Sequence, residues 1–333
     1  MYTQRKYSLF LAALLCLVIC LHTALATVDP YSECIDAYNT ILSNPSSPAE
    51  ALETLLAYAE GGYISAQTML GTLYDFGIGV LQNAGEATKW FTLAADSGDA
   101  MALYQLGGMY AREQSSPRDY DKAFDLFLRS AQMGYAPAQY DLGNLYRDGN
   151  GTEVSLTDAL QWYKAAAVQG HPSAQVCLGV LLLENPACMD QVKAFEWFMK
   201  AAEQSDTIGL HNVGYCYYYG YGVSQSYTNA MEWLLAASEL GHPVSGLYIG
   251  DMYYFGEGIR QDFAEAFKWY CISAERGQPE AQLTLGLLYE YGIGTERDQE
   301  LAAKWNKAAN DQGYYAIQEN TWAFLREAMF PEE

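Results

Sequence analysis

The sequence predicts an all-α solenoid of seven helix-turn-helix repeats of about 36 residues, with capping helices at both ends. Three residue types predict it, because glycine, alanine and tryptophan each recur about once per 36 residues. The glycine series is Gly71, Gly107, Gly143, Gly179, Gly214, Gly250 and Gly286. The alanine series is Ala87, Ala123, Ala159, Ala194, Ala230, Ala266 and Ala302. The tryptophan series is Trp90, Trp162, Trp197, Trp233, Trp269 and Trp305, with Leu126 in the remaining position.

The first helix of each repeat is predicted from the residues around the glycine. Between Ala281 and Tyr289, for example, small or apolar residues lie at every fourth position, which is helical spacing. A Gly-x-Gly pair such as Gly292 and Gly294 then ends the helix, because glycine readily adopts the left-handed backbone of a tight exit.

The second helix contains the alanine, followed by tryptophan and another aromatic residue, as in Ala266, Trp269 and Tyr270. It ends at a further glycine, here Gly277. Small residues let the helix axes approach closely, and the large aromatic residues fill the space between neighbouring pairs. Because a single helix pair does not bury its own apolar face, the repeats must stack to be stable.

This pattern resembles the Sel-one-like repeat family, a relative of the tetratricopeptide repeats. In the sixth repeat the motif residues are Ile249, Gly250, Tyr253, Gly256, Gly258, Ala266, Trp269, Tyr270, Ser273, Ala274 and Gly277. The resemblance covers seven units, about residues 66–316, and implies a right-handed α/α solenoid. The second, fourth and seventh repeats depart from the motif. The departing residues are Glu113, Ser115, Leu126, Leu182, Asn185, Ala187 and Asn306.

The ends of the chain differ from the repeats. Residues 1–26 are predicted to be a secretory signal peptide, with a basic start, an apolar stretch and a small-residue cleavage site ending at Ala26. The alternative is an uncleaved membrane anchor. Residues 27–65 are expected to form N-terminal capping helices, and residues 317–333 a C-terminal capping helix and tail. We therefore expect a secreted, periplasmic or secretory-lumen protein without a membrane span in its mature chain.

Five cysteines follow the predicted signal peptide: Cys34, Cys177, Cys188, Cys216 and Cys271. Cys177 lies on a predicted first helix and Cys188 on the turn beyond it. An oxidising compartment would permit a disulfide between these two residues, and the favoured alternative is two separate buried thiols.

Composition and motifs argue against several classes of function. The formal net charge of −22 opposes binding of nucleic acid and anionic lipid. The charge either keeps the protein soluble or steers a basic partner. No histidine pair has metal-ligand spacing, no phosphate-binding loop occurs, and the Gly-x-Gly pairs follow helices and not strands. We therefore expect no cofactor, no metal and no enzymatic activity.

The resemblance implies that first helices line a concave surface. The residues it places there in the last three repeats are His211, Tyr215, Tyr218, Tyr219, Asp251, Tyr254, Phe255, Glu290 and Tyr291. Such an aromatic surface edged with acids suits peptide or sugar recognition. Alternatively, these aromatic residues pack between adjacent first helices.

The family's members are generally adaptors, so the resemblance implies a scaffold that binds a protein or peptide on its concave face. One alternative is a polysaccharide-associated binding protein, since aromatic and acidic side chains also suit sugars. A further alternative is an enzyme acting on cell-wall peptides or β-lactams, since some relatives have been linked to β-lactam binding.

Overall fold

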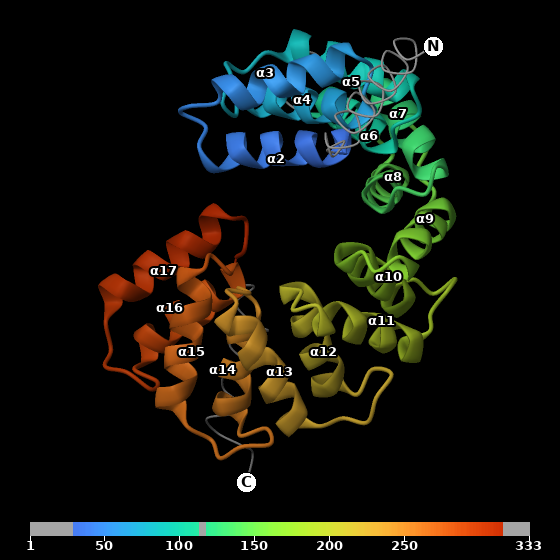
Figure 1. The fold of residues 1–333 in the computed structure, drawn as a ribbon. Coiled ribbons are helices and arrows are strands. Elements are labelled where there is room, and N and C mark those ends of the chain that lie inside the picture. Colours follow the sequence, from blue (N-terminus) through green and yellow to red (C-terminus); the bar gives the residue numbers. More distant parts are fainter. Residues whose placement is uncertain (1–28, 113–117, 316–333) are drawn as a thin grey trace, which may run out of the picture. The chain divides into compact units, whose positions relative to one another are not determined.

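The computed structural model describes residues 29–112 and 118–315 (Figure 1). In these ranges the chain forms sixteen helices and no strand. It divides into two compact units, residues 1–154 and 155–333. The helices of the first unit are α2 (Pro30–Ser43), α3 (Ala49–Glu60), α4 (Ile64–Phe76), α5 (Ala84–Asp96), α6 (Ala100–Ala111), α7 (Tyr120–Gln132) and α8 (Ala136–Asp148). Those of the second unit are α9 (Leu156–Val168), α10 (Pro172–Glu184), α11 (Gln191–Glu203), α12 (Thr207–Tyr219), α13 (Tyr227–Glu239), α14 (Ser245–Phe255), α15 (Phe263–Glu275), α16 (Pro279–Tyr291) and α17 (Gln299–Asp311).

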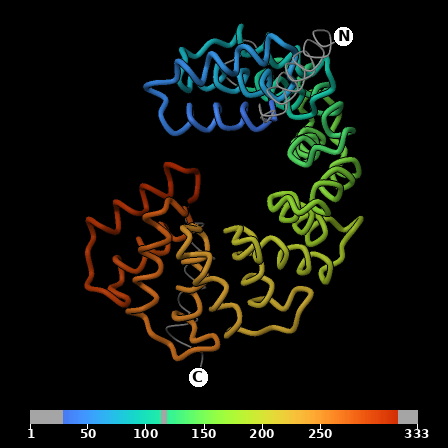
Figure 2. Tube along the Cα trace, viewed as in Figure 1, coloured from blue at the N-terminus to red at the C-terminus, as the bar shows by residue number. Residues whose placement is uncertain are grey.

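Within each unit, consecutive helices pack side by side and alternate in direction (Figure 2). The pairs α4–α5 and α6–α7 belong to the first unit, and α10–α11 through α16–α17 to the second. The prediction of an all-helical stack of helix-turn-helix repeats is thereby confirmed. The predicted signal peptide, residues 1–26, and the predicted C-terminal cap, residues 317–333, lie outside the described residues. No helix in the described part of the chain combines the length and apolar character needed to cross a bilayer.

The second helix of every repeat begins at a residue that caps it. In each case a short polar side chain accepts a hydrogen bond from a backbone N–H of the first helical turn, which would otherwise lack a partner. These capping residues are Asn83, Asp119, Ser155, Asp190, Ser226, Asp262 and Asp298. The start of each second helix is therefore encoded locally, independently of the packing that follows.

In six of the seven repeats the glycine of the first helix makes room for a side chain of the second helix. A Cβ atom on Gly250 would lie 2.7 Å from the Tyr270 ring, and one on Gly179 would lie 2.5 Å from the Phe198 ring. In both pairs the residue after the tryptophan is a buried side chain that contacts the glycine face of its partner helix. This contact explains why the glycine and tryptophan series recur together along the chain.

The Gly-x-Gly turn has a steric basis at both positions. Gly256 ends α14 with a left-handed φ of 74°. Gly258 has a φ of 69°, and a Cβ atom there would lie 2.2 Å from Tyr227 Cβ, so the turn packs directly on the preceding second helix. The two repeats without this motif end differently, since α6 and α10 pass into extended backbone at Arg112 and Asn185.

The disulfide that the sequence allowed between Cys177 and Cys188 is not formed in the structure. Both residues are half-buried thiols, and the Cys188 thiol donates to the Leu181 carbonyl oxygen at 3.5 Å. The turn after α10 thus directs the Cys188 side chain back onto the C-terminal end of α10. Cys34 and Cys216 are buried thiols, and burial raises the pKa of Cys216 to about 12, which makes it unreactive.

Candidate functional site

Four tyrosines of the second unit form a continuous group of rings on α12, α14 and the turn after α12. We call Tyr215, Tyr219, Tyr221 and Tyr248 the tyrosine cluster. Tyr215 and Tyr219 are four residues apart on α12, so they share one helix face, and their ring centroids are 4.8 Å apart. Tyr248 of α14 meets Tyr215 edge to face at 5.7 Å. The left-handed exit at Gly220 then brings Tyr221 back against Tyr219, with the two rings stacked at 5.5 Å.

The tyrosine cluster contains one exposed ring and three partly buried rings. Tyr219 is 46% exposed, whereas the other three rings are partly buried. Desolvation raises the pKa of Tyr215 and of Tyr219, so both hydroxyls remain protonated at neutral pH. The cluster therefore offers aromatic faces together with hydroxyl groups that can both donate and accept hydrogen bonds.

Tyr218, which the resemblance places on the open surface, is instead buried, with 8% of its surface exposed. Its hydroxyl donates to the Glu257 carboxylate, and its ring meets Tyr227 edge to face at 5.4 Å. Gln225 holds the same region by donating to the Tyr218 carbonyl oxygen at 2.8 Å. Tyr218 thus joins α12 to the turn of the next repeat and belongs to the core.

Tyr254 is also part of the core, with 0% exposure, although the same reasoning placed it on the surface. Its ring lies 5.0 Å from Phe263 and 6.4 Å from Tyr270, both on α15. Burial raises the pKa of Tyr254 to about 12. The position after the motif tyrosine faces the second helix in these two repeats, whereas Tyr217 and Tyr253 are only partly buried.

Asp251 of α14 contributes to the packing of α14 against α15. Its carboxylate accepts a hydrogen bond from the fully buried Tyr270 hydroxyl at 2.6 Å. Desolvation raises the pKa of Asp251 to about 7, and the nearby carboxylates of Glu280 and Glu257 act in the same direction. Such a carboxyl could exchange a proton at neutral pH. Its hydrogen-bond partner is the enclosed Tyr270 hydroxyl, so we assign it to the fold and not to a reaction.

His211 is buried next to the tyrosine cluster, with its ring centroid 5.7 Å from that of Tyr248. Its ring stacks on His242 at 4.1 Å, and the Nδ1 atoms of both rings lie 3.0 and 3.1 Å from the Ser245 hydroxyl oxygen. Burial lowers the pKa of His211 to about 3 and that of His242 to about 4, so both rings are neutral at pH 7. A serine beside histidine is the arrangement of nucleophilic catalysis, but Ser245 has no exposed surface and no substrate can reach it.

The three remaining predicted positions lie at the ends of α14 and α16. Phe255 is partly buried, and its ring packs on Tyr254 at 5.0 Å. Glu290 is partly buried, and its carbonyl oxygen accepts from Arg297 Nε at 2.8 Å. Tyr291 is 41% exposed. Of these three, Tyr291 offers the most open aromatic surface.

Two members of the tyrosine cluster were not anticipated from the sequence. Tyr248 stands two positions before Gly250, and Tyr221 occupies the middle of a Gly-x-Gly turn. The available signal was composition, since Tyr215, Tyr219 and Tyr221 fall within seven consecutive residues. Only the placement of α14 beside α12 adds Tyr248 to them.

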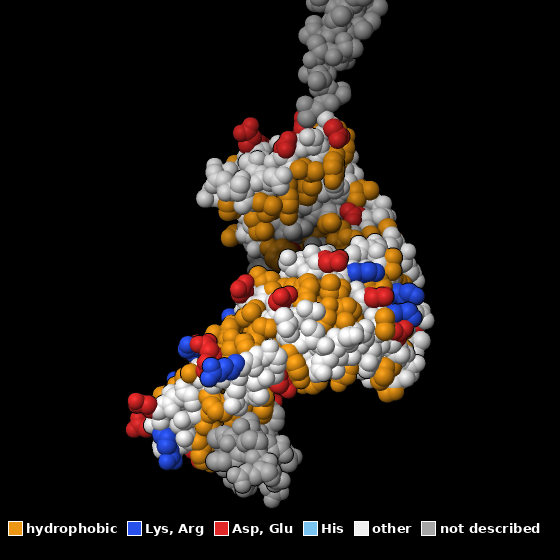
Figure 3. All heavy atoms as spheres, turned by 90° about the horizontal axis from the view of Figure 1, so that it is seen from below, with side chains coloured by type: hydrophobic (Ala, Val, Ile, Leu, Met, Phe, Trp, Pro, Cys, Tyr) orange, Lys and Arg blue, Asp and Glu red, His pale blue; other side chains and the backbone are white. Residues whose placement is uncertain are grey.

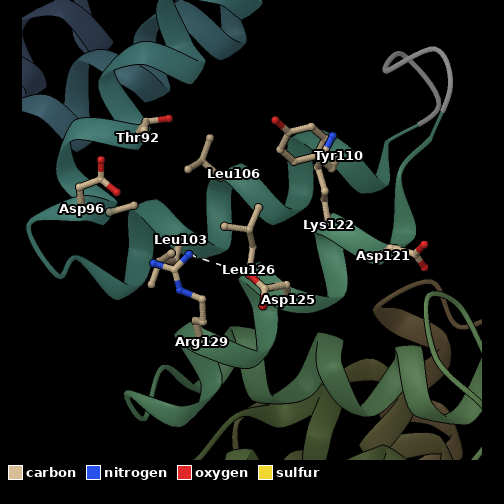
Figure 4. A pocket seen from close by; sticks show the side chains of 11 residues that line it. Thr92, Asp96, Leu103, Leu106, Tyr110, Asp121, Lys122, Asp125, Leu126 and Arg129 are labelled. Carbon is tan, nitrogen blue, oxygen red and sulfur yellow. Dashed lines mark ion pairs between the residues drawn. The ribbon is translucent and has the colours of Figure 1, made fainter.

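In the first unit, the C-terminal end of α4 carries an acidic residue and a phenylalanine, Asp75 and Phe76. Asp75 is buried and forms an ion pair with Arg112 at 2.8 Å. The Arg112 guanidinium also lies over the ring of Phe76, which is 55% exposed. The first unit further contains a hollow of about 500 Å³ between α5, α6 and α7 (Figure 4).

The described residues contain no metal-binding group but carry exposed hydrophobic patches. Within residues 29–112 and 118–315, no group of three or more histidine, cysteine, aspartate or glutamate side chains could hold a metal ion. On the face drawn in Figure 3, hydrophobic side chains form patches between separate acidic and basic groups. Exposed apolar patches with polar borders are typical of surfaces that bind a partner.

Comparison with known proteins identifies the repeat. The sequence matches the Sel1 repeat at residues 64–99, 100–135, 136–171, 186–206, 207–242, 247–278 and 279–314. The structure is similar to a Sel1 repeat protein from Oxalobacter formigenes, with 28% sequence identity and a TM-score of 0.65, over 88% of this chain and 86% of that chain. It is also similar to a protective antigen with an SLR fold from uropathogenic Escherichia coli, with 26% identity and a TM-score of 0.57, over 85% of this chain and 72% of that chain. No curated protein sequence matches the chain.

Proposed function

Because the chain belongs to the Sel1 repeat family, we propose that it is a non-catalytic scaffold that binds a protein or peptide through the tyrosine cluster. The observation that carries this proposal is the group of four tyrosine rings in which each ring contacts at least two others and one is nearly half exposed. Tyrosine provides a large rigid contact with a polar tip and loses little side-chain entropy on binding, which suits it to peptide recognition.

The same proposal places the protein outside the cytosol, in a medium, periplasm or secretory lumen. It rests on the signal-peptide pattern of residues 1–26. Determining the N-terminal residue of the exported protein tests this placement, and we expect Thr27.

The binding test uses the purified protein as bait in an extract of its own compartment. We expect a discrete protein to be captured by the wild type and lost when Tyr219 and Tyr221 are both replaced by alanine. Removing two central aromatic contacts costs about 2 kcal/mol or more of binding free energy, or roughly thirtyfold in affinity. The matched control is Tyr31→Ala, since Tyr31 is 57% exposed and lies on α2 of the first unit, so it is not a member of the tyrosine cluster.

Three outcomes would contradict this proposal. Capture that the double substitution leaves unchanged would exclude the tyrosine cluster as the binding surface. Retention on a polysaccharide column, with no protein captured, would indicate a glycan-binding protein. Turnover of a labelled cell-wall peptide or a β-lactam would indicate an enzyme.

A further inference from the structure

The hollow in the first unit lies where other repeats hold an indole ring. Its floor and walls include Leu103 and Leu106 of α6, Leu126 of α7 and Thr92 of α5 (Figure 4). Leu126 is the residue that replaces tryptophan in the tryptophan series. The side chain that closes this space in other repeats is therefore absent here.

The sixth repeat shows how the same space is normally filled. Trp269 packs there against a cluster that contains Ile249, with Leu235 and Tyr253 alongside it. Counted along the repeat, these three neighbours correspond to Leu106, Thr92 and Tyr110. All three of these residues line the hollow, together with Leu126, which occupies the position of Trp269: the set is Thr92, Leu106, Tyr110 and Leu126.

The fifth repeat gives the same result independently. Trp233 packs in a cluster with Val213, Tyr217 and Met199, and Met199 corresponds to Thr92. Two side chains beside the hollow are therefore smaller than their counterparts, namely Leu126 of the second repeat for tryptophan and Thr92 of the first repeat for methionine or leucine. Both replacements enlarge the hollow, which has a volume of about 500 Å³ and an apolar base.

The border of the hollow carries an excess of negative charge. Its basic groups are already paired, Arg129 with Asp125 at 3.9 Å and Lys122 with Asp119 at 2.8 Å. Among the described residues, Asp96 and Asp121 line the hollow without an ion pair. An incoming group with positive charge beside its aromatic ring would complement these carboxylates.

We propose that this hollow binds the tryptophan side chain of a partner segment in which basic residues flank the tryptophan. The indole would take the place of the missing repeat tryptophan and contact Leu103, Leu106 and Leu126. The flanking basic side chains would lie near Asp96 and Asp121. This site lies on α5, α6 and α7 of the first unit, and it does not depend on the tyrosine cluster of the second unit.

The test measures binding of the peptide acetyl-Lys-Trp-Lys-amide to the full-length protein by methyl NMR. We expect saturable shifts of the Leu103, Leu106 and Leu126 methyl resonances. Replacing the peptide's tryptophan with alanine should abolish these shifts. Changing both peptide lysines to glutamate should weaken binding about tenfold, because the acidic border then repels the peptide.

Two substitutions of the protein fill the hollow from inside. Leu126→Trp restores the repeat residue, and Thr92→Leu restores the apolar neighbour found at Leu235. We expect both variants to unfold at a higher temperature than the wild type and to bind the peptide at least about tenfold more weakly. Thr92→Leu keeps the test valid if the larger replacement does not fold.

Several results would overturn the proposal. They are the absence of saturable shifts in the wild type, equal binding by both filled variants, and equal binding of the acidic peptide. Free indole binding as tightly as the basic peptide would also overturn it, because the occupant would then be a free heteroaromatic ligand and not a partner segment.

Discussion

At the scale of single residues, the repeat positions are set by contacts between the two helices of a pair. The glycine in the first helix is needed because an aromatic ring such as Tyr270 lies where its Cβ atom would be. The repeated alanines are almost completely buried for the same reason, since a larger side chain would force the helices apart. The residues that depart from the motif should therefore be the weak points of the stack.

Asn306 is such a point, because it stands where other repeats have an aromatic or leucine side chain. Its Oδ1 atom is buried and accepts no hydrogen bond from the described residues. We expect Asn306→Leu, which matches Leu234, to raise the free energy of unfolding by about 1 kcal/mol by removing an unsatisfied acceptor. Urea unfolding checks this, with the surface change Asn310→Leu as control. An unchanged or lower free energy of unfolding would contradict the assignment of Asn306 as a weak point of the stack.

Asp251 should make the stability of the protein depend on pH. Its pKa rises from 3.8 to about 7 on folding, so the folded state holds a proton that the unfolded state releases between these values. Stability from this group is therefore present below about pH 4 and lost as the pH rises toward 7. In Asp251→Asn this loss should disappear, while the Tyr270 hydroxyl keeps an acceptor. Urea midpoints measured from pH 4 to 8 for both proteins check it, and parallel curves would contradict the assignment.

At the scale of elements, short sequence signals determine where the helices of each repeat begin and end. A capping residue starts the second helix, and glycines in left-handed conformation end the first helix in five repeats. These signals act before any stacking occurs. Substitutions at the caps should therefore reduce stability without changing the arrangement of helices.

Asp262 provides a direct test of a cap. Its carboxylate accepts hydrogen bonds from the backbone N–H groups of Ala264 and Glu265 at 3.0 and 3.1 Å. Asp262→Ala should lower the free energy of unfolding by about 1 kcal/mol, whereas Asp262→Asn should change it by much less because it retains an acceptor. Equal losses in the two variants, measured by urea unfolding, would assign the effect to charge and not to capping.

Helix positions were predictable from the sequence because they follow from these local signals and from one strict interval. In contrast, the sequence did not predict which of several adjacent aromatic residues is buried and which is exposed. Tyr217, Tyr218 and Tyr219 are consecutive, so they point in three directions around α12, and only packing against the next repeat decides which one is exposed. The structure buries Tyr218 and exposes Tyr219 because Glu257 and Tyr227 receive the Tyr218 side chain.

At the scale of the whole molecule, the repeats are similar in backbone but have diverged in side chains. The second unit contains the tyrosine cluster, and the first contains the Asp75–Arg112 ion pair and the hollow beside Leu126. Function in such a stack depends on these local differences, since the repeat itself supplies a platform. A net charge of −22 favours a basic partner for either surface.

The most direct test of the central claim compares two double substitutions for both partner affinity and urea unfolding midpoint. We predict that Tyr219→Ala with Tyr221→Ala loses the captured partner and keeps the midpoint close to that of the wild type. Tyr218→Phe with Tyr254→Phe should lower the midpoint and, in the folded protein, keep partner affinity. The reverse pattern would show that the binding surface is not the tyrosine cluster and would contradict the account.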